Sequence, residues 1–181
     1  MESQALGGRA DLTATSSAAA ATSTSTDVAA IERELMLVSR YTVLATNRSA
    51  ADLYLERSAY LLLSRIDAEG PMSIGELAKV FGLDTSTINR QTAAMSRSGL
   101  VERIADPAGG PARKLQITAD GLDRLRANRA WAVGGIGRVL GDWDPDDLAA
   151  LARLLTQFNT TIERRQGHSW PRPEQTHTSR P

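Results

Sequence analysis

The side chains of this chain that are best suited to chemistry lie between residues 85 and 98, at helical spacing. Ser86, Arg90 and Arg97 follow one another at intervals of four and seven, so an α-helix brings them onto one face. Hydroxyl and guanidinium groups can donate hydrogen bonds to base edges and to phosphates. The alternative is an ordinary solvated face, but such faces often carry Glu–Lys pairs at four-residue spacing, and none occurs in this stretch. The pattern favours a surface that binds nucleic acid.

Other polar residues lie beside this face. Thr87 and Asn89 flank it, and Gln91 lies at its edge. A helix that presents these residues to solvent needs an anchor on its other side. The residues expected to face the core are Ile88, Thr92 and Met95. The nucleic-acid contacts predicted on this helix are therefore Ser86, Thr87, Asn89, Arg90, Gln91 and Arg97.

A second basic group follows along the chain. Arg113 and Lys114 come shortly after Gly109-Gly110-Pro111, which is typical of a solvent-exposed hairpin tip. A basic pair behind a small tip is suited to phosphate or minor-groove contact. Two basic residues on a hairpin are also a common feature of protein surfaces, so both interpretations stay open.

The composition argues against several other kinds of site. The 181 residues have a formal net charge of zero and a pI of about 6.7, so any basic surface must be local. Cysteine is absent, which excludes disulfides and thiolate metal sites, and the two histidines, His168 and His177, fall in a proline-rich tail. No apolar run approaches the roughly 18 residues of a membrane span. We expect a cytoplasmic protein that is not an enzyme, has no cofactor or metal, and does not bind a membrane.

The basic helix is the second of two short helices. Ser73 and Glu76 form a capping-box pattern that predicts the start of the first, and Gly82 permits a tight turn after it. Leu83 is expected to fill the angle between the helices, and Asp84 to cap the second. Two strands follow, the first beginning at about residue 100 and the second covering 113–117. With a buried helix at about 53–68, these elements predict a winged helix-turn-helix, a mostly α fold with a small β-wing.

The remaining helices predict a scaffold. One is capped by Asp27, and the last is capped by Asp144 and begins at Pro145. Each carries an apolar stripe at alternating spacings of three and four. These stripes are expected to pack together, within one subunit or between two. We favour a helical dimerisation layer formed by the N- and C-terminal helices over an intramolecular core. A helix at 119–140 lies before the last one, and Gly134, Gly135 and Gly137 predict a bend or close packing there.

The domain boundaries follow from these elements. The low-complexity segment 1–26 lacks the large apolar residues needed to fold, and so does most of 167–181, where packing of Trp170 is the alternative. We predict that both are disordered tails and that 27–166 is a single domain. Within it, 27–50 and 119–166 are the predicted dimerisation helices and 53–118 is the predicted DNA-binding part.

The order of these parts resembles the multiple-antibiotic-resistance regulator (MarR) family, over about Val28 to Arg165. The set of short motifs is similar to the family's "LA…STv-R…GLveR…DP…LT-G" run. The resemblance implies a homodimer that binds palindromic double-stranded DNA, usually as a repressor, and is released by small aromatic or anionic ligands. The motifs are Glu76-Leu77-Ala78, Ser86-Thr87-Ile88-Asn89-Arg90, Ser98-Gly99-Leu100-Val101-Glu102-Arg103, Asp106-Pro107, and Ile117-Thr118 with Gly121.

The resemblance places Ser86, Thr87, Asn89 and Arg90 on the family's recognition helix, but the wing departs from the pattern. Many members have an arginine at the wing tip, where this sequence has Gly109-Gly110-Pro111. Either Arg113 and Lys114 take over the minor-groove contact, or the wing contributes less to binding here.

The hypothesis that follows is a ligand-responsive transcriptional repressor whose partners are double-stranded DNA, a second copy of the chain and a small-molecule effector. The alternative is a dimeric winged-helix adaptor that binds a protein partner rather than DNA, and an enzyme is a remote third. An effector crevice is expected between the dimer layer and the winged helix. Its candidate lining residues, each also explicable as ordinary core or surface, are Arg40, Tyr41, Arg57 and Tyr60.

Overall fold

The computed structural model describes residues 25–40 and 55–172. The chain divides into two compact units, Met1–Thr46 and Asn47–Pro181. In the first unit a helix covers residues 25–40, in agreement with the helix expected from Asp27. The predicted tail before residue 25 and the predicted continuation of the helix to residue 50 lie outside the described residues. No helix in the described ranges is long and apolar enough to cross a membrane.

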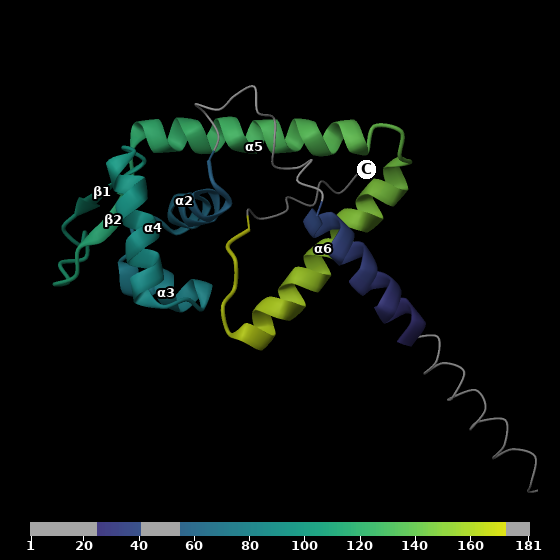
Figure 1. Cartoon of the computed structure of the whole chain (residues 1–181), viewed down its shortest axis with the longest axis horizontal. Helices are drawn as coiled ribbons and strands as arrows, with labels where there is room; N and C mark the ends of the chain where they lie inside the picture. The colour runs from purple at the N-terminus through teal and green to yellow at the C-terminus, as the bar shows by residue number, and fades with distance from the viewer. Residues whose placement is uncertain (1–24, 41–54, 173–181) are drawn as a thin grey trace, which may run out of the picture. The chain divides into compact units, whose positions relative to one another are not determined.

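The second unit consists of helices and one small antiparallel sheet (Figure 1). The sheet pairs Val101 with Ile117 and Ile104 with Lys114. The predicted mostly α fold with a β-wing is confirmed. The elements are α2 (Arg57–Glu69), α3 (Ile74–Phe81), α4 (Thr85–Arg97), β1 (Val101–Ile104), β2 (Lys114–Ile117), α5 (Ala119–Val139) and α6 (Pro145–Gln166).

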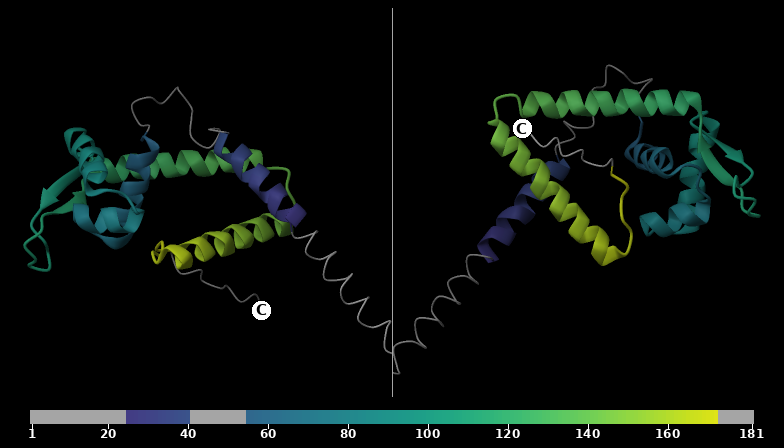
Figure 2. Two further views of the ribbon diagram at one scale, coloured as in Figure 1. Left: turned by 60° about the horizontal axis from the view of Figure 1, so that its bottom comes forward. Right: turned by 180° about the vertical axis from the view of Figure 1, so that it is seen from behind.

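Helix α2 is the centre of the hydrophobic core. It packs against α5, α4 and β2, and both figures show it between α5 and α3 (Figures 1 and 2). Its residues Leu62, Leu63 and Ile66 are almost fully buried. Burial of apolar side chains of this size is the main favourable contribution to folding. The other elements supply the remaining large buried residues, among them Leu77, Ile88, Leu115 and Leu125.

The capping box predicted at the start of α3 is present. The Ser73 hydroxyl accepts a hydrogen bond from the Glu76 N–H (3.2 Å), and the Glu76 carboxylate accepts one from the Ser73 N–H (2.7 Å). This second bond is the main reason why the pKa of Glu76 is lowered. At the other end of α3, Gly82 adopts the left-handed conformation with φ of 61°.

The turn after α3 corrects two expectations about side chains. The Leu83 side chain is 44% exposed and does not fill the angle between the helices. Its backbone N–H instead donates to the carbonyl oxygen of Ala78 (3.0 Å), while Gly82 donates to Lys79 (3.3 Å). Asp84 occupies the N-cap position of α4, but its side chain makes no capping hydrogen bond. Backbone hydrogen bonds therefore fix this turn, and they direct the Leu83 side chain outward.

The glycines of α5 do not break the helix. It continues from Ala119 to Val139 through Gly134 and Gly137, and Gly135 is buried. Glycine retains its backbone N–H and C=O groups, so it lowers helix propensity without removing a hydrogen bond from the helix. The helix is continuous at these glycines, and the burial of Gly135 agrees with close packing, one of the two predicted alternatives.

The disordered tail predicted from residue 167 is wrong for residues 167–172. In this segment the Ser169 carbonyl oxygen accepts a hydrogen bond from Arg65, and the Trp170 ring contacts Phe81. A large aromatic ring supplies the contact area that the rest of the low-complexity tail lacks. The remainder of the predicted tail, 173–181, lies outside the described residues.

We predict opposite effects of two glycine substitutions within α5. A Cβ atom at Gly121 would lie 2.1 Å from the Leu100 carbonyl oxygen, which is backbone and cannot move aside, whereas a Cβ at Gly137 meets nothing within 4 Å. Gly121→Ala should lower the free energy of unfolding by about 1–3 kcal/mol because it overpacks this contact. Gly137→Ala should raise it by about 0.5–1 kcal/mol because alanine is the better helix former. Urea unfolding at one fixed protein concentration measures both, and equal effects would show that the contact at Gly121 is not tight.

Candidate nucleic-acid interface

Helix α4 is anchored on one side by three buried residues. Ile88 and Thr92 have no measurable exposure and Met95 is 3% exposed. The Thr92 hydroxyl donates to the Ile88 carbonyl oxygen (2.8 Å), so a polar side chain is accommodated in the core without an unsatisfied group. The predicted inward face is confirmed, and the orientation of α4 is set by it.

The opposite side of α4 is exposed and basic. Ser86, Asn89, Arg90 and Arg97 are exposed, whereas Thr87 and Gln91 are half-buried at its margins. The helix contains no acidic residue. The structure therefore brings four of the predicted side chains together on one surface, which we call the basic face of α4, with the other two beside it. Such a face can donate hydrogen bonds to base edges and phosphates.

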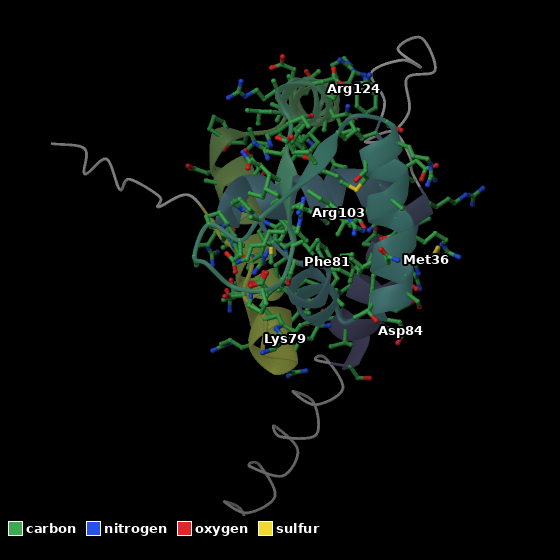
Figure 3. All side chains as sticks on the ribbon, turned by 90° about the vertical axis from the view of Figure 1, so that its left-hand side faces the viewer. Met36, Lys79, Phe81, Asp84, Arg103 and Arg124 are labelled. Atoms are coloured by element: carbon green, nitrogen blue, oxygen red, sulfur yellow. The ribbon has the colours of Figure 1, made fainter. Side chains whose placement is uncertain are left out.

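Arg103 also belongs to this surface. It lies on β1, outside the helix and the wing residues from which the interface was predicted. Its guanidinium donates to the Asn89 side-chain oxygen (3.2 Å), and Figure 3 labels it between the strands and α4. Its own carbonyl oxygen accepts a hydrogen bond from Arg113 (2.9 Å). Arg103 thus connects the hairpin to α4. Its only signal in the sequence is its place at the end of the Gly99-Leu100-Val101-Glu102-Arg103 motif, since the pairing with Asn89 depends on the fold.

The structure separates the two basic residues predicted on the wing. Arg113 is exposed and precedes β2. The Lys114 ammonium lies 3.5 Å from a carboxylate oxygen of Glu76 and 3.5 Å from one of Asp106, and its side chain is only 18% exposed. Lys114 is therefore engaged within the protein, and Arg113 is the member of the pair that is presented to solvent.

The wing tip is organised by Asp106. Its carboxylate accepts a hydrogen bond from the Ala108 N–H (3.0 Å), and its carbonyl oxygen accepts one from Gly109 (2.9 Å). Gly109 has a φ of 78°, and a Cβ added at Gly110 would collide with the Asp106 carboxylate. Larger residues are disfavoured at both positions. This geometry accounts for the presence of glycine at both positions of the tip.

The described residues give no support for an effector site formed by the four predicted residues. Arg40 is exposed in the first unit and Tyr41 lies outside the described residues. In the second unit Arg57 is exposed, and Tyr60 packs against the hydrophobic core. Neither of two clefts of that unit, with volumes of about 540 and 580 Å³, is lined by any of the four.

Comparisons with known proteins converge on one family. Residues 55–108 match the MarR family. YxaD, an HTH-type transcriptional regulator of Bacillus subtilis, is 34% identical over 129 residues, which are 71% of this chain and 90% of YxaD. Among solved structures, a MarR family protein from Bacillus stearothermophilus has a TM-score of 0.64 at 18% identity and covers 76% of this chain and 96% of its own. RV1404 from Mycobacterium tuberculosis has a TM-score of 0.64 at 22% identity, with 80% and 97% covered.

The family match falls on the elements that build this surface. Residues 55–108 contain α2, α3, α4, β1 and the first part of the wing tip. The identity with YxaD extends over most of both chains, and the solved structures share the fold. From this agreement between sequence, fold and surface we conclude that the chain belongs to the MarR family of transcriptional regulators.

Proposed function

We propose that this regulator is a sequence-specific DNA-binding repressor that acts as a homodimer. The observation that carries the proposal is the basic face of α4. Arg90 and Arg97 are exposed on a helix without acidic residues, and Arg103 and Arg113 lie on the adjoining hairpin. The net charge of the chain is zero, so this is a local concentration of positive charge. A helix of this kind can enter a major groove while the hairpin contacts the backbone or the minor groove.

Exposed apolar residues support the dimer. In α6 no residue is buried, so its stripe is not used as core within the described chain. Contiguous exposed apolar surface of this kind usually marks an interaction site. A two-fold dimer would place two α4 helices in successive major grooves, about 34 Å apart, and would favour a palindromic operator. The exposed residues are Val28, Ile31, Leu35, Met36 and Val38 in the helix at 25–40 and Leu154, Leu155, Phe158 and Ile162 in α6.

We further propose release by a small aromatic or anionic ligand, which acts by shifting the dimer between two states. Only a difference in the ligand's affinity for the DNA-bound and the free conformation can change DNA binding. Arg40, Tyr41, Arg57 and Tyr60 remain the candidate contacts from the sequence. Titration of the protein–DNA complex with aromatic acids tests this part of the proposal separately from DNA binding itself.

We predict that Arg90→Ala weakens binding to the operator by about 1–3 kcal/mol, as for the loss of a base or close phosphate contact. Fluorescence anisotropy with DNA from upstream of the gene, titrated over a series of salt concentrations, measures this. Arg126→Ala is the matched control, because Arg126 is an exposed arginine on α5 that pairs with Asp123. For the wild type, a plot of the logarithm of the association constant against the logarithm of the salt concentration should have a slope of about −0.9 for each phosphate that the protein neutralises. Absence of binding, or affinity that does not change with salt, would favour the protein-adaptor alternative.

The two basic residues of the wing should behave differently. Arg113→Ala should lower the affinity for DNA and reduce the magnitude of the salt slope by about 1, as expected for the loss of one phosphate contact. Lys114→Ala should leave the slope unchanged, because its ammonium is already paired with Glu76 and Asp106. The same anisotropy titrations compare the two variants. Equal changes in slope would mean that Lys114 leaves its carboxylate partners to bind DNA.

A further inference from the structure

The end of α6 is connected back to the helix-turn-helix by residues 167–172, which we call the C-terminal strap. Helix α6 ends at Gln166, and Gly167 turns the chain with a φ of 74°. The next residue, His168, donates its backbone N–H to the Glu163 carbonyl oxygen (3.2 Å). The strap therefore begins with a well-defined helix end rather than with a frayed one.

The strap contacts α2 through a buried charge. Arg65 is 5% exposed and donates two hydrogen bonds to the Glu69 carboxylate, at 2.9 and 2.6 Å. Its remaining terminal nitrogen donates to the Ser169 carbonyl oxygen (2.7 Å), and its guanidinium carbon lies 5.3 Å from the centre of the Trp170 ring. A buried cation is costly unless it is fully paired. The strap supplies both the last acceptor and an aromatic face.

The strap contacts α3 at the residue that leads into the turn. The rings of Trp170 and Phe81 are 6.1 Å apart in an edge-to-face arrangement at 75°. Phe81 is the last residue of α3, and Gly82 and the start of α4 follow directly (Figure 3 labels Phe81 and Asp84). Edge-to-face contact is a favourable geometry for two aromatic rings. Trp170 thus packs on the element whose position determines where α4 begins.

The strap is also fastened to α6. The Glu163 carboxylate accepts hydrogen bonds from the Trp170 N–H (3.1 Å) and from Arg172 (2.9 Å). The Arg172 bonds, followed by the Trp170 bond, lower the pKa of Glu163 to about 2, so this carboxylate is ionised near neutral pH. A cleft of about 540 Å³ is lined by residues of α3, α6 and the strap, among them Phe81, Asn159 and Trp170. No residue of α6 is buried, and the strap joins the C-terminal end of this helix to α2 and α3.

We propose that the C-terminal strap holds the helix-turn-helix in a fixed orientation relative to α6, with Trp170 and Arg65 as positioning residues for DNA binding. The proposal rests on the proposed function, because α6 there belongs to the dimer layer that sets the spacing of the two α4 helices. A helix-turn-helix held at the correct spacing loses less orientational freedom when it binds. In the proposed complex each helix-turn-helix binds its own half-site with α4, whereas the strap contacts described above are made with α2, α3 and α6. The strap should therefore matter for binding two half-sites together, not for binding one.

The first test measures strap packing without DNA. In the full chain with Trp131→Phe and Trp143→Phe, Trp170 is the remaining tryptophan. Acrylamide should quench its fluorescence several-fold less efficiently in the folded protein than in urea. Glu163→Gln, which weakens the fastening to α6 and leaves the core intact, should raise quenching towards the unfolded value. Equal quenching of the folded and unfolded protein would overturn the proposal, and so would a Glu163→Gln variant that quenches like its parent.

The second test measures positioning. Trp170→Ala should weaken binding to a two-half-site operator about tenfold, or roughly 1.4 kcal/mol, with an unchanged salt slope and unchanged affinity for a single half-site. Trp143→Ala is the matched control, because Trp143 is exposed in the turn between α5 and α6 and takes part in neither the Phe81 nor the Arg65 contact of Trp170. Trp170→Phe should restore part of the affinity.

The outcomes separate this proposal from the proposed function. If the wild type does not bind DNA, the repressor proposal fails, and the quenching experiment still decides whether the strap is packed. If Trp170→Ala binds both DNAs like the wild type, the strap has no positioning role. If it loses the same affinity for one half-site as for two, Trp170 supports the fold of the winged helix and not its orientation, and the proposal is overturned.

Discussion

The burial of one side of α4 is the constraint on which the proposed DNA-binding surface depends. Ile88, Thr92 and Met95 lie in the core beside α2, and this fixes which residues of α4 face outward. Thr92 satisfies its hydroxyl within the helix, so the polar residue does not loosen the packing. Rotation of α4 would expose apolar residues and bury Arg90, both of which are unfavourable. The basic face is therefore held in place by hydrophobic packing behind it.

The basic residues of the hairpin are of two kinds: Lys114 is paired with carboxylates of the protein, and Arg103 and Arg113 are exposed to solvent. Asp106 folds the tip around its carboxylate and, together with Glu76, pairs with Lys114. Arg103 and Arg113 remain exposed; Arg103 donates to Asn89 of α4, and Arg113 donates to the Arg103 carbonyl oxygen. A chain with no net charge can present a basic surface in this way, because α4 itself contains no acid and the nearby Glu76 and Asp106 are paired with Lys114.

Besides its packing around α2, the winged helix contacts the start of α5 and the strap at the end of α6. The Thr118 N–H and a Cβ-less Gly121 allow the start of α5 to approach the Leu100 carbonyl oxygen closely. At the other end, the C-terminal strap joins α6 to Arg65 and Phe81. In a regulator whose proposed operator has two half-sites, movement of the helical layer would reach α4 through these contacts and through the packing of α2 between α5 and α4.

Local features were determined by the sequence alone, and contacts between distant segments only by the tertiary structure. The capping box at Ser73, the two faces of α4 and the glycine-rich wing tip follow from interactions within a few residues, which a short stretch of sequence encodes. The outward direction of Leu83 and the pairing of Lys114 depend on how α3 and the hairpin are placed in space. The packing of Trp170 is the clearest case, because its cation partner lies more than a hundred residues earlier in the chain. The composition of 167–172 predicted a disordered tail. Only the fold places this segment beside the buried Arg65, whose guanidinium has a hydrogen-bonding nitrogen that Glu69 does not pair.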